Sequence, residues 1–160
     1  MTDRPAQRPR DRLGRPLPYG SAGVPPLPEG LPGSPRAVLR ATQELLDTGL
    51  YFQAHELLEG AWKAAPTTER GLWRGLTQIV VGLVHTARGN HRGAARLLRR
   101  GLGELASYPL ESDGTTPGST AHTIPVDLPG VTRWARDLLA RLESDEPSNG
   151  CPDPPRLLTR

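Results

Sequence analysis

The stretch GLYFQAHELLEGAW, residues 49–62, decides the fold prediction because its outline recurs at residues 89–102 as GNHRGAARLLRRGL. In both copies a glycine opens the stretch, an alanine follows one and a half helical turns later, and a Leu-Leu pair occupies the middle. Glycine permits a tight turn, and the small alanine side chain permits close approach of a neighbouring helix. Each copy is therefore predicted to be the second helix of a helix-turn-helix pair.

The glycine-to-alanine spacing resembles the turn of tetratricopeptide repeats, although those repeats have a period of about 34 residues. Residues 49–62 and 89–102 are further apart than that, and two units are fewer than a stable solenoid requires. We therefore expect an all-α fold, a compact array of about five helices made of two tetratricopeptide-like hairpins and a C-terminal helix.

Local signals predict where each helix begins and ends. Ser34 followed by Pro35 is typical of a helix start, Gly49 ends that helix, and Asn90 and Asp127 are typical caps. Pro66 ends the second helix, and either Thr67 or Thr68 is expected to cap the third. The predicted helices span residues 35–48, 51–65, 67–89, 91–106 and, after a start at Asp127 with Pro129, 130–143. No segment predicts a strand.

The two ends of the chain differ in composition from its middle. Residues 1–33 form a tail rich in proline, glycine and arginine, and residues 144–160 contain four further prolines. Such segments bury too little apolar surface to offset the entropy of ordering, so both are expected to be disordered. The helical domain is predicted to span residues 34–143, with a mobile loop near residues 107–126 that is rich in Gly, Ser, Thr and Pro.

Composition excludes several classes of protein. The formal net charge is only +3, and the single cysteine, Cys151, excludes an intrachain disulfide or a cysteine-rich zinc site. No apolar run reaches the roughly 18 residues that a membrane span needs, and no apolar stretch follows the basic N-terminus. We expect a cytoplasmic protein without a membrane partner.

The second predicted helix carries a polar stripe. An α-helix turns by about 100° per residue, so His55, Glu59 and Trp62 share one face. We expect this face to be buried, with Glu56 toward its edge and Lys63 pointing away. Leu57 falls on the polar side, where it is expected to meet the fifth helix or another chain.

The third predicted helix offers partners for that stripe. Gly71, Gly75 and Gly82 lie on one face together with Gln78 and His85. Because glycine has no side chain, we expect the second helix to pack against this face and to bring Gln78 and His85 close to His55 and Glu59. A buried carboxylate needs a cation, a hydrogen-bond donor or a proton, which these neighbours would supply.

The pattern H-x-x-x-E-x-x-W, formed by His55, Glu59 and Trp62, resembles the signature of domain-of-unknown-function family 309, small helical proteins of bacteria and archaea. The segments YFQAHELLEGAW, GLTQIVVGLVH and GNHRGAARLL resemble that family too, over roughly residues 45–106. The resemblance implies an all-α fold without an established activity. It also implies suspected metal binding, and some members carry the label of metal-dependent hydrolase.

One interpretation of the stripe is a site for a divalent metal or small ligand. His55 and Glu59, one turn apart, are candidate ligands, His85 is a third, and Gln78 would hydrogen-bond to a ligand. Nitrogen and oxygen donors suit zinc, iron or manganese, and Glu56 is a weak candidate for the general base of a hydrolase. Trp62 and Tyr51 would cover the cluster.

A second interpretation is structural. The same side chains would form a hydrogen-bonded network that fixes the register of the helices, and the protein would act by binding another protein or a second copy of itself. An i, i+4 His–Glu pair is a common contact on helices, so no ligand is needed to explain it.

Nucleic acid is a third, less favoured partner. The fourth predicted helix carries a stripe of arginines that would suit phosphates, namely Arg92, Arg96, Arg99 and Arg100. However, Glu104 shares the helix, aromatic residues are scarce, and the net charge is small. A solvated basic face explains these arginines better.

Overall fold

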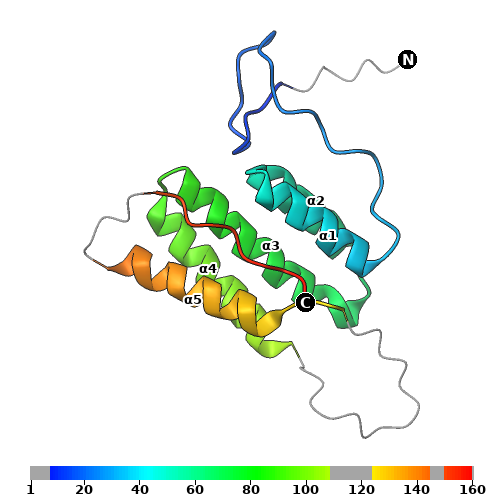
Figure 1. Cartoon of the computed structure of the whole chain (residues 1–160), viewed down its shortest axis with the longest axis vertical. Coiled ribbons are helices and arrows are strands. Elements are labelled where there is room, and N and C mark those ends of the chain that lie inside the picture. The colour runs from blue at the N-terminus through cyan, green and yellow to red at the C-terminus, as the bar shows by residue number, and fades with distance from the viewer. Residues whose placement is uncertain (1–7, 109–123, 145–149, 160) are drawn as a thin grey trace, which may run out of the picture.

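The computed structural model describes residues 8–108, 124–144 and 150–159. This part of the chain contains five helices, as predicted, and no strand (Figure 1). The helices are α1 (Pro35–Asp47), α2 (Tyr51–Ala64), α3 (Thr67–Ala87), α4 (His91–Ser107) and α5 (Leu128–Glu143). The all-α prediction is confirmed, whereas the likeness of the hairpins to tetratricopeptide repeats stays a prediction.

Local side-chain chemistry begins three of the helices. Ser34 caps α1 by accepting a hydrogen bond from the amide of Ala37, and Asn90 and Asp127 cap α4 and α5 in the same way. The prediction fails at α3, which starts at Thr67 after Pro66 and has no side-chain cap. A proline preceding the first turn sets the extended entry to α3 without help from either threonine.

Two glycines make the predicted tight turns. Gly49 lies between α1 and α2 with φ of 78°, and Gly89 lies between α3 and α4 with φ of 79°. Backbone in this left-handed region strains any residue with a β-carbon, so both turns depend on glycine.

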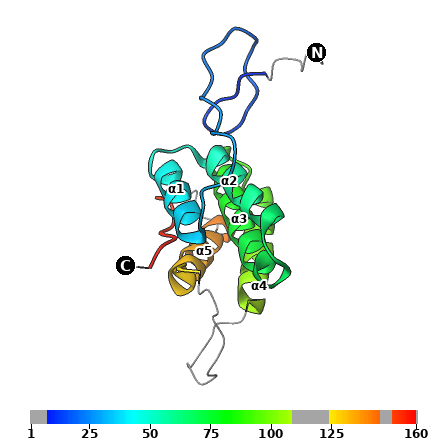
Figure 2. The same ribbon diagram turned by 90° about the vertical axis from the view of Figure 1, so that its right-hand side faces the viewer.

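The helices pack as neighbours in chain order: α1 on α2, α2 on α3, α3 on α4 and α4 on α5. Figure 2 shows α1 and α5 on the same side of the layer that α2, α3 and α4 form. The core lies between these elements, and its largest fully buried side chains are Leu39, Leu46, Leu58, Leu72, Leu76, Ile79, Leu83, Leu98 and Leu138.

The glycine face of α3 packs against α4, so the expectation that it receives α2 is wrong. A β-carbon at Gly75 would lie 2.9 Å from Leu105, and one at Gly82 would lie 2.9 Å from Leu98. Both leucines belong to α4 and occupy the space that the glycines leave open. Periodicity identifies a face of small residues on α3, but it does not say whether α2 or α4 packs against that face.

Leu57 also has a different neighbour from the one expected. Its side chain is 9% exposed and lines, with Ala41 and Leu45 of α1, a groove between α1 and α2. The residue that seemed misplaced on the polar side of α2 therefore lies on the side of α2 that faces α1, the helix on which α2 packs.

Residues 150–159 differ from the disordered tail that their composition predicts. Leu157 is fully buried, and the amide nitrogen of Asp127 donates a 2.8 Å hydrogen bond to its carbonyl oxygen. The segment runs between α1 and α5 (Figure 1). Only a few apolar side chains of this proline-rich stretch make the contact, namely Pro155, Leu157 and Leu158, and average composition does not detect them.

No helix in the described ranges is both long enough and apolar enough to cross a membrane.

The close contact of α3 with α4 predicts opposite effects of one substitution at two positions of α4. A β-carbon at Gly101 would meet Ile79 at 2.8 Å and the carbonyl oxygen of Gly75 at 3.0 Å, whereas nothing lies within 4 Å of one at Gly103. We expect Gly101→Ala to lower the free energy of unfolding by about 1–3 kcal/mol through overpacking. Gly103→Ala should raise it by roughly 0.5–1 kcal/mol through helix propensity.

Urea unfolding followed by circular dichroism measures both values. Gly103→Ala serves as the matched control for the intrinsic effect of alanine in α4. Equal stabilisation by the two substitutions would contradict the close approach of α3 to α4.

Candidate functional site

The His55–Glu59 pair predicted from the spacing is present on α2. His55 Nε2 lies 3.2 Å from Glu59 Oε2, and the two side chains are 18% and 34% exposed. His55 Nδ1 lies 2.9 Å from the carbonyl oxygen of Phe52. A carbonyl oxygen only accepts, so Nδ1 carries the proton and donates. The ring of His55 also packs on the ring of Phe52, with centroids 4.9 Å apart.

Lys63 completes this cluster, although it was predicted to point away. Its Nζ lies 2.6 Å from Glu59 Oε1, one turn further along α2. Phe52, His55, Glu59 and Lys63 therefore form a chain of contacts along one helix, which we call the α2 relay. Both oxygens of the Glu59 carboxylate have a partner within the α2 relay, so its charge is compensated locally.

The α2 relay determines the ionisation of Glu59. The hydrogen bond from Lys63 lowers the pKa of the Glu59 carboxyl below its ordinary value of 4.5, against the opposing effect of burial. The positive charge of Lys63 and the contact with His55 lower this pKa further. Glu59 is thus a carboxylate at neutral pH, held mainly by the only lysine in the chain.

His85 lies at the turn between α3 and α4. Its Nδ1 is 2.9 Å from the amide nitrogen of the Asn90 side chain, the residue that caps α4. Burial lowers the pKa of His85, and the charge of Arg88 adds to this effect. The side chain of His85 therefore contacts the cap of α4 and not the α2 relay.

Gln78 lines a pocket of about 540 Å³ between α3 and α4. Arg74 and Glu104 form an ion pair of 2.7 Å at its edge, and Arg100 and Ser107 complete its wall. Gln78 Oε1 and Arg74 Nε are buried there without a hydrogen-bond partner among the described residues. Gln78 lies on the glycine face of α3, which packs against α4. Its neighbours are therefore side chains of α4 and not His55 and Glu59 of α2.

The remaining predicted site residues have other surroundings. Trp62 is partly buried against the hydrophobic core, and Tyr51 lies beside Cys151 of the C-terminal segment. Burial raises the pKa of Tyr51, and the neighbouring Cys151 and Asp153 add to the rise. Glu56 is exposed and lines the open grooves between α2 and the N-terminal residues, so it does not join the α2 relay.

The described residues supply only part of a metal centre. His55 Nε2 and Glu59 Oε2 are two adjacent donors, but no group of three or more His, Cys, Asp or Glu in these ranges is arranged to hold a metal ion. A catalytic zinc site uses three protein ligands, and the Lys63 ammonium already occupies the other oxygen of Glu59. His122, which lies in the predicted mobile loop, falls outside the described residues.

Residues 8–33 form an irregular N-terminal arm that passes over α1 and α2 (Figure 1). Arg12 donates a hydrogen bond to the carbonyl oxygen of Thr48, and Arg10 lies over the ring of Phe52. Further along the arm, Leu31 packs over Gly60, where a β-carbon would lie 3.2 Å from it. The arm and the helices together line an apolar groove of about 780 Å³, which we call the α1–α2 groove.

Sequence reasoning missed two of these features. The Glu59–Lys63 contact had a visible signal, because the two residues stand at i and i+4 with the favourable order of charges. The contact of Leu31 with Gly60 had no comparable signal in the sequence, because the two residues are distant in the chain and the arm has no apolar periodicity.

The lowered pKa of Glu59 predicts a pH-dependent contribution to stability. A folded-state pKa below the unfolded value stabilises the fold above the unfolded value, and the effect is lost as the pH falls through the folded-state value. We expect Glu59→Gln to cost roughly 0.5 kcal/mol at neutral pH, because the pair is partly exposed and screened. The difference from wild type should shrink as the pH falls below the ordinary value of 4.5 and disappear below the lowered folded-state pKa.

Urea unfolding at a series of pH values measures this difference. Lys63→Met is the control, because it removes the main cause of the shift and should flatten the pH dependence of the Glu59→Gln effect. A cost of Glu59→Gln that stays constant from neutral to acidic pH would contradict the α2 relay.

Comparisons with known proteins agree with the helical region just described. The chain is 38% identical over 69 residues to the uncharacterized protein YpuF of Bacillus subtilis (strain 168), an alignment that covers 42% of this chain and 40% of the relative. The chain thus spans less than half the length of that relative, and no solved structure matches it. Residues 39–97, from α1 into α4, match the model of a domain of unknown function. This part of the chain is a DUF309 domain, which confirms the family predicted from His55, Glu59 and Trp62.

Proposed function

We propose that this protein is a helical binding module that holds polypeptide segments on the faces of its helices. The observation that carries this proposal is that segments from both sides of the helical domain already lie on such faces. Leu31 of the N-terminal arm packs over α2, and Leu157 of the C-terminal segment is fully buried. Helix faces with apolar grooves are a common means of recognising polypeptides.

The α2 relay fits a structural role within this module. Each polar end of the relay has a protein partner, from the Phe52 carbonyl to the Lys63 ammonium. Such partly exposed i, i+4 contacts contribute a few tenths of a kcal/mol each and favour a helical α2 without needing a ligand.

A divalent-metal or small-ligand site, with hydrolysis as its activity, is the second candidate function. One observation favours it: the Phe52 carbonyl holds the proton on His55 Nδ1, so Nε2, when it carries no proton, can act as a metal ligand 3.2 Å from Glu59 Oε2. Backbone orientation of one ring nitrogen is common among histidine ligands of metals. The second candidate needs a further ligand, and its proposed base, Glu56, lies apart from the pair.

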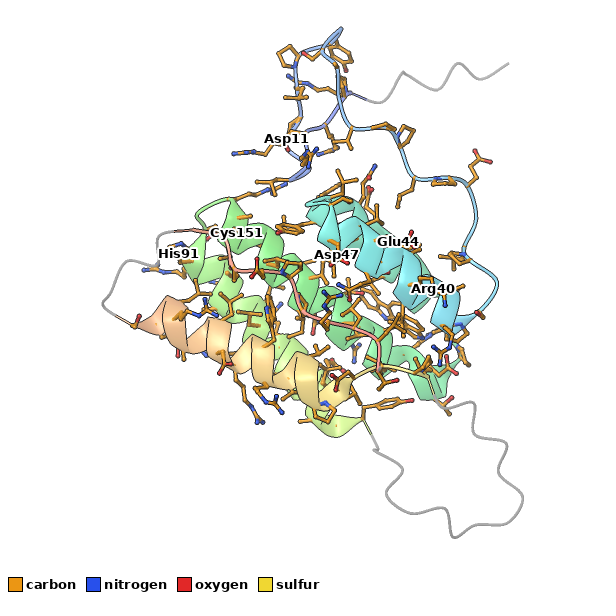
Figure 3. The ribbon with its side chains drawn as sticks, viewed as in Figure 1. Asp11, Arg40, Glu44, Asp47, His91 and Cys151 are labelled. Carbon is orange, nitrogen blue, oxygen red and sulfur yellow. The ribbon has the colours of Figure 1, made fainter. Side chains whose placement is uncertain are left out.

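Thermal unfolding with and without metal distinguishes the two candidates. With zinc or manganese supplied, or with a chelator, we expect the melting temperature of the full chain to change by less than about 1 °C. The same experiment on His55→Ala should give the same small change. The control is His91→Ala, a histidine that Figure 3 shows at the start of α4.

A metal-dependent rise of about 4 °C or more that His55→Ala abolishes and His91→Ala retains would overturn the structural role and establish the second candidate.

The α1–α2 groove provides a direct test of binding. Leu31 is 42% exposed and closes part of this groove, so Leu31→Asp should uncover its apolar lining. We expect the fluorescence of added anilinonaphthalene sulfonate, a dye that binds apolar surface, to rise several-fold while the helix content measured by circular dichroism stays unchanged.

Tyr19→Asp is the matched control, because Tyr19 is 74% exposed on the same arm and is not among the residues that line the groove. Equal dye fluorescence in wild type and Leu31→Asp would show that the groove does not bind apolar groups.

A further inference from the structure

The C-terminal segment 150–159 occupies a space that no helix fills. Helix α1 packs mainly on α2, and α5 packs mainly on α4, while both lie on the same side of the array. The segment lies between them and runs opposite to α5: Trp134 bonds to Asp153, and Asp127 bonds to Leu157. We call the surface that these contacts define, formed by Gln43 of α1 together with Asp127 and Trp134 at α5, the α1–α5 groove.

Gln43 of α1 forms two hydrogen bonds with the backbone of the segment. Its amide nitrogen donates to the carbonyl oxygen of Pro155 at 3.2 Å, and its amide oxygen accepts from the nitrogen of Leu157 at 2.8 Å. Gln43 is only 8% exposed, so an unpaired amide here would be costly. Both ends of a buried side-chain amide thus pair with an extended chain, as a neighbouring strand would.

The opposite wall of the groove completes the pairing. The amide nitrogen of Asp127, the cap of α5, donates to the carbonyl oxygen of Leu157 at 2.8 Å. Trp134 Nε1 donates to the carbonyl oxygen of Asp153 at 2.8 Å. These contacts involve main-chain atoms of the segment, and every residue except proline offers an amide nitrogen to Gln43.

Side-chain selection comes from alternate positions. Leu157 is 0% exposed and Pro155 is buried, whereas the side chain of Arg156 between them is 80% exposed. An extended segment directs successive side chains to opposite sides, so the groove selects proline and leucine two residues apart. The side chain of Arg156 between them points outward, and its guanidinium lies 3.9 Å from the carboxylate of Asp47 on α1.

We propose, resting on the binding function above, that the α1–α5 groove is a binding site for extended Pro-x-Leu segments. In this chain its own residues 150–159 act as the tethered competitor. The ligand is an extended polypeptide with a free backbone amide at the leucine. The C-terminal segment and α5 both lie outside residues 39–97. The site is therefore formed jointly by the DUF309 domain and by sequence beyond it.

The segment can open without unfolding the domain. It adds no helix, its buried apolar side chains are Leu157 and Pro155, and Leu158 is partly buried against the core. Regions with few buried apolar contacts open at lower free energy than the core. A short tether holds a ligand at an effective concentration on the order of millimolar, so an added peptide meets strong competition in the wild type.

The test uses the full chain and a fluorescein-labelled synthetic peptide of residues 150–159. Leu157→Asp places a charge in the apolar pocket and releases the tethered segment. We expect fluorescence anisotropy to show micromolar binding of the peptide to the Leu157→Asp chain and binding at least about tenfold weaker to wild type. Arg156→Ala removes only an exposed, 3.9 Å ion pair with Asp47, which contributes little, so this variant should behave as wild type does.

The assigned role of Gln43 is tested in the Leu157→Asp background. Adding Gln43→Ala should weaken peptide binding about tenfold or more, because two hydrogen bonds are lost. Gln53→Ala on α2 is the matched control and should leave it unchanged. Binding that does not respond to Gln43→Ala overturns the site.

A Leu157→Asp chain with wild-type helix content that fails to bind the peptide overturns the proposal. If dye still binds at the α1–α2 groove of Leu31→Asp, the general binding function stands and only this site fails. A wild-type dimer that Leu157→Asp abolishes would mean that a second copy supplies the segment, and would overturn the assignment of a tethered competitor.

Hydrogen exchange of the wild type gives a second measurement that does not require any variant to fold. The amide of Leu157 should exchange at least about tenfold faster than those of fully buried α3 residues such as Leu76. Equal protection at the two positions would make the segment an inseparable part of the core and overturn the proposal.

Discussion

The close approach of α3 to α4 is the constraint on which the rest of the structure depends. Gly75 and Gly82 of α3 leave room for Leu105 and Leu98 of α4. In the other direction, Gly101 of α4 leaves room for Ile79 of α3. Interiors are packed so densely that a face of small residues admits one partner at contact distance. Once α4 takes that place, Gln78 beside the glycine face lines the pocket between α3 and α4, and His85 contacts Asn90, the cap of α4. Helix α2 must then satisfy its own polar stripe.

The packing of α3 against α4 explains why the polar groups of the α2 motif find their partners within α2. A carboxylate in a dry interior would need a partner from another helix. Glu59 is 34% exposed, so its desolvation is partial, and Lys63 on the same helix is sufficient as a counter-charge. His55 likewise bonds to the backbone of its own helix through Phe52. A His–Glu spacing on a helix therefore does not by itself indicate a ligand site, because the same helix can satisfy both groups.

The features that were predictable from the sequence are those with local causes. Ser34, Asn90 and Asp127 begin helices through hydrogen bonds within three residues, and Gly49 and Gly89 make turns through their own backbone. The His55–Glu59 contact also spans a single turn. In contrast, the partner of the glycine face and the burial of Leu157 are long-range choices. Periodicity states which face of a helix is apolar, but it carries no information about which segment covers that face.

The same distinction bears on what can be learned from relatives. The DUF309 match ends at residue 97, within α4, so α5 and the C-terminal segment lie beyond it. The α1–α5 groove has one wall inside the match and one outside it. The Gln43 amide pairs with an extended backbone, yet the opposite hydrogen bond to Leu157 comes from Asp127, the cap of α5. A binding specificity formed in this way belongs to the complete arrangement of α1, α5 and the segment. It therefore has to be established on this chain, because the shared domain alone contains only half of the site.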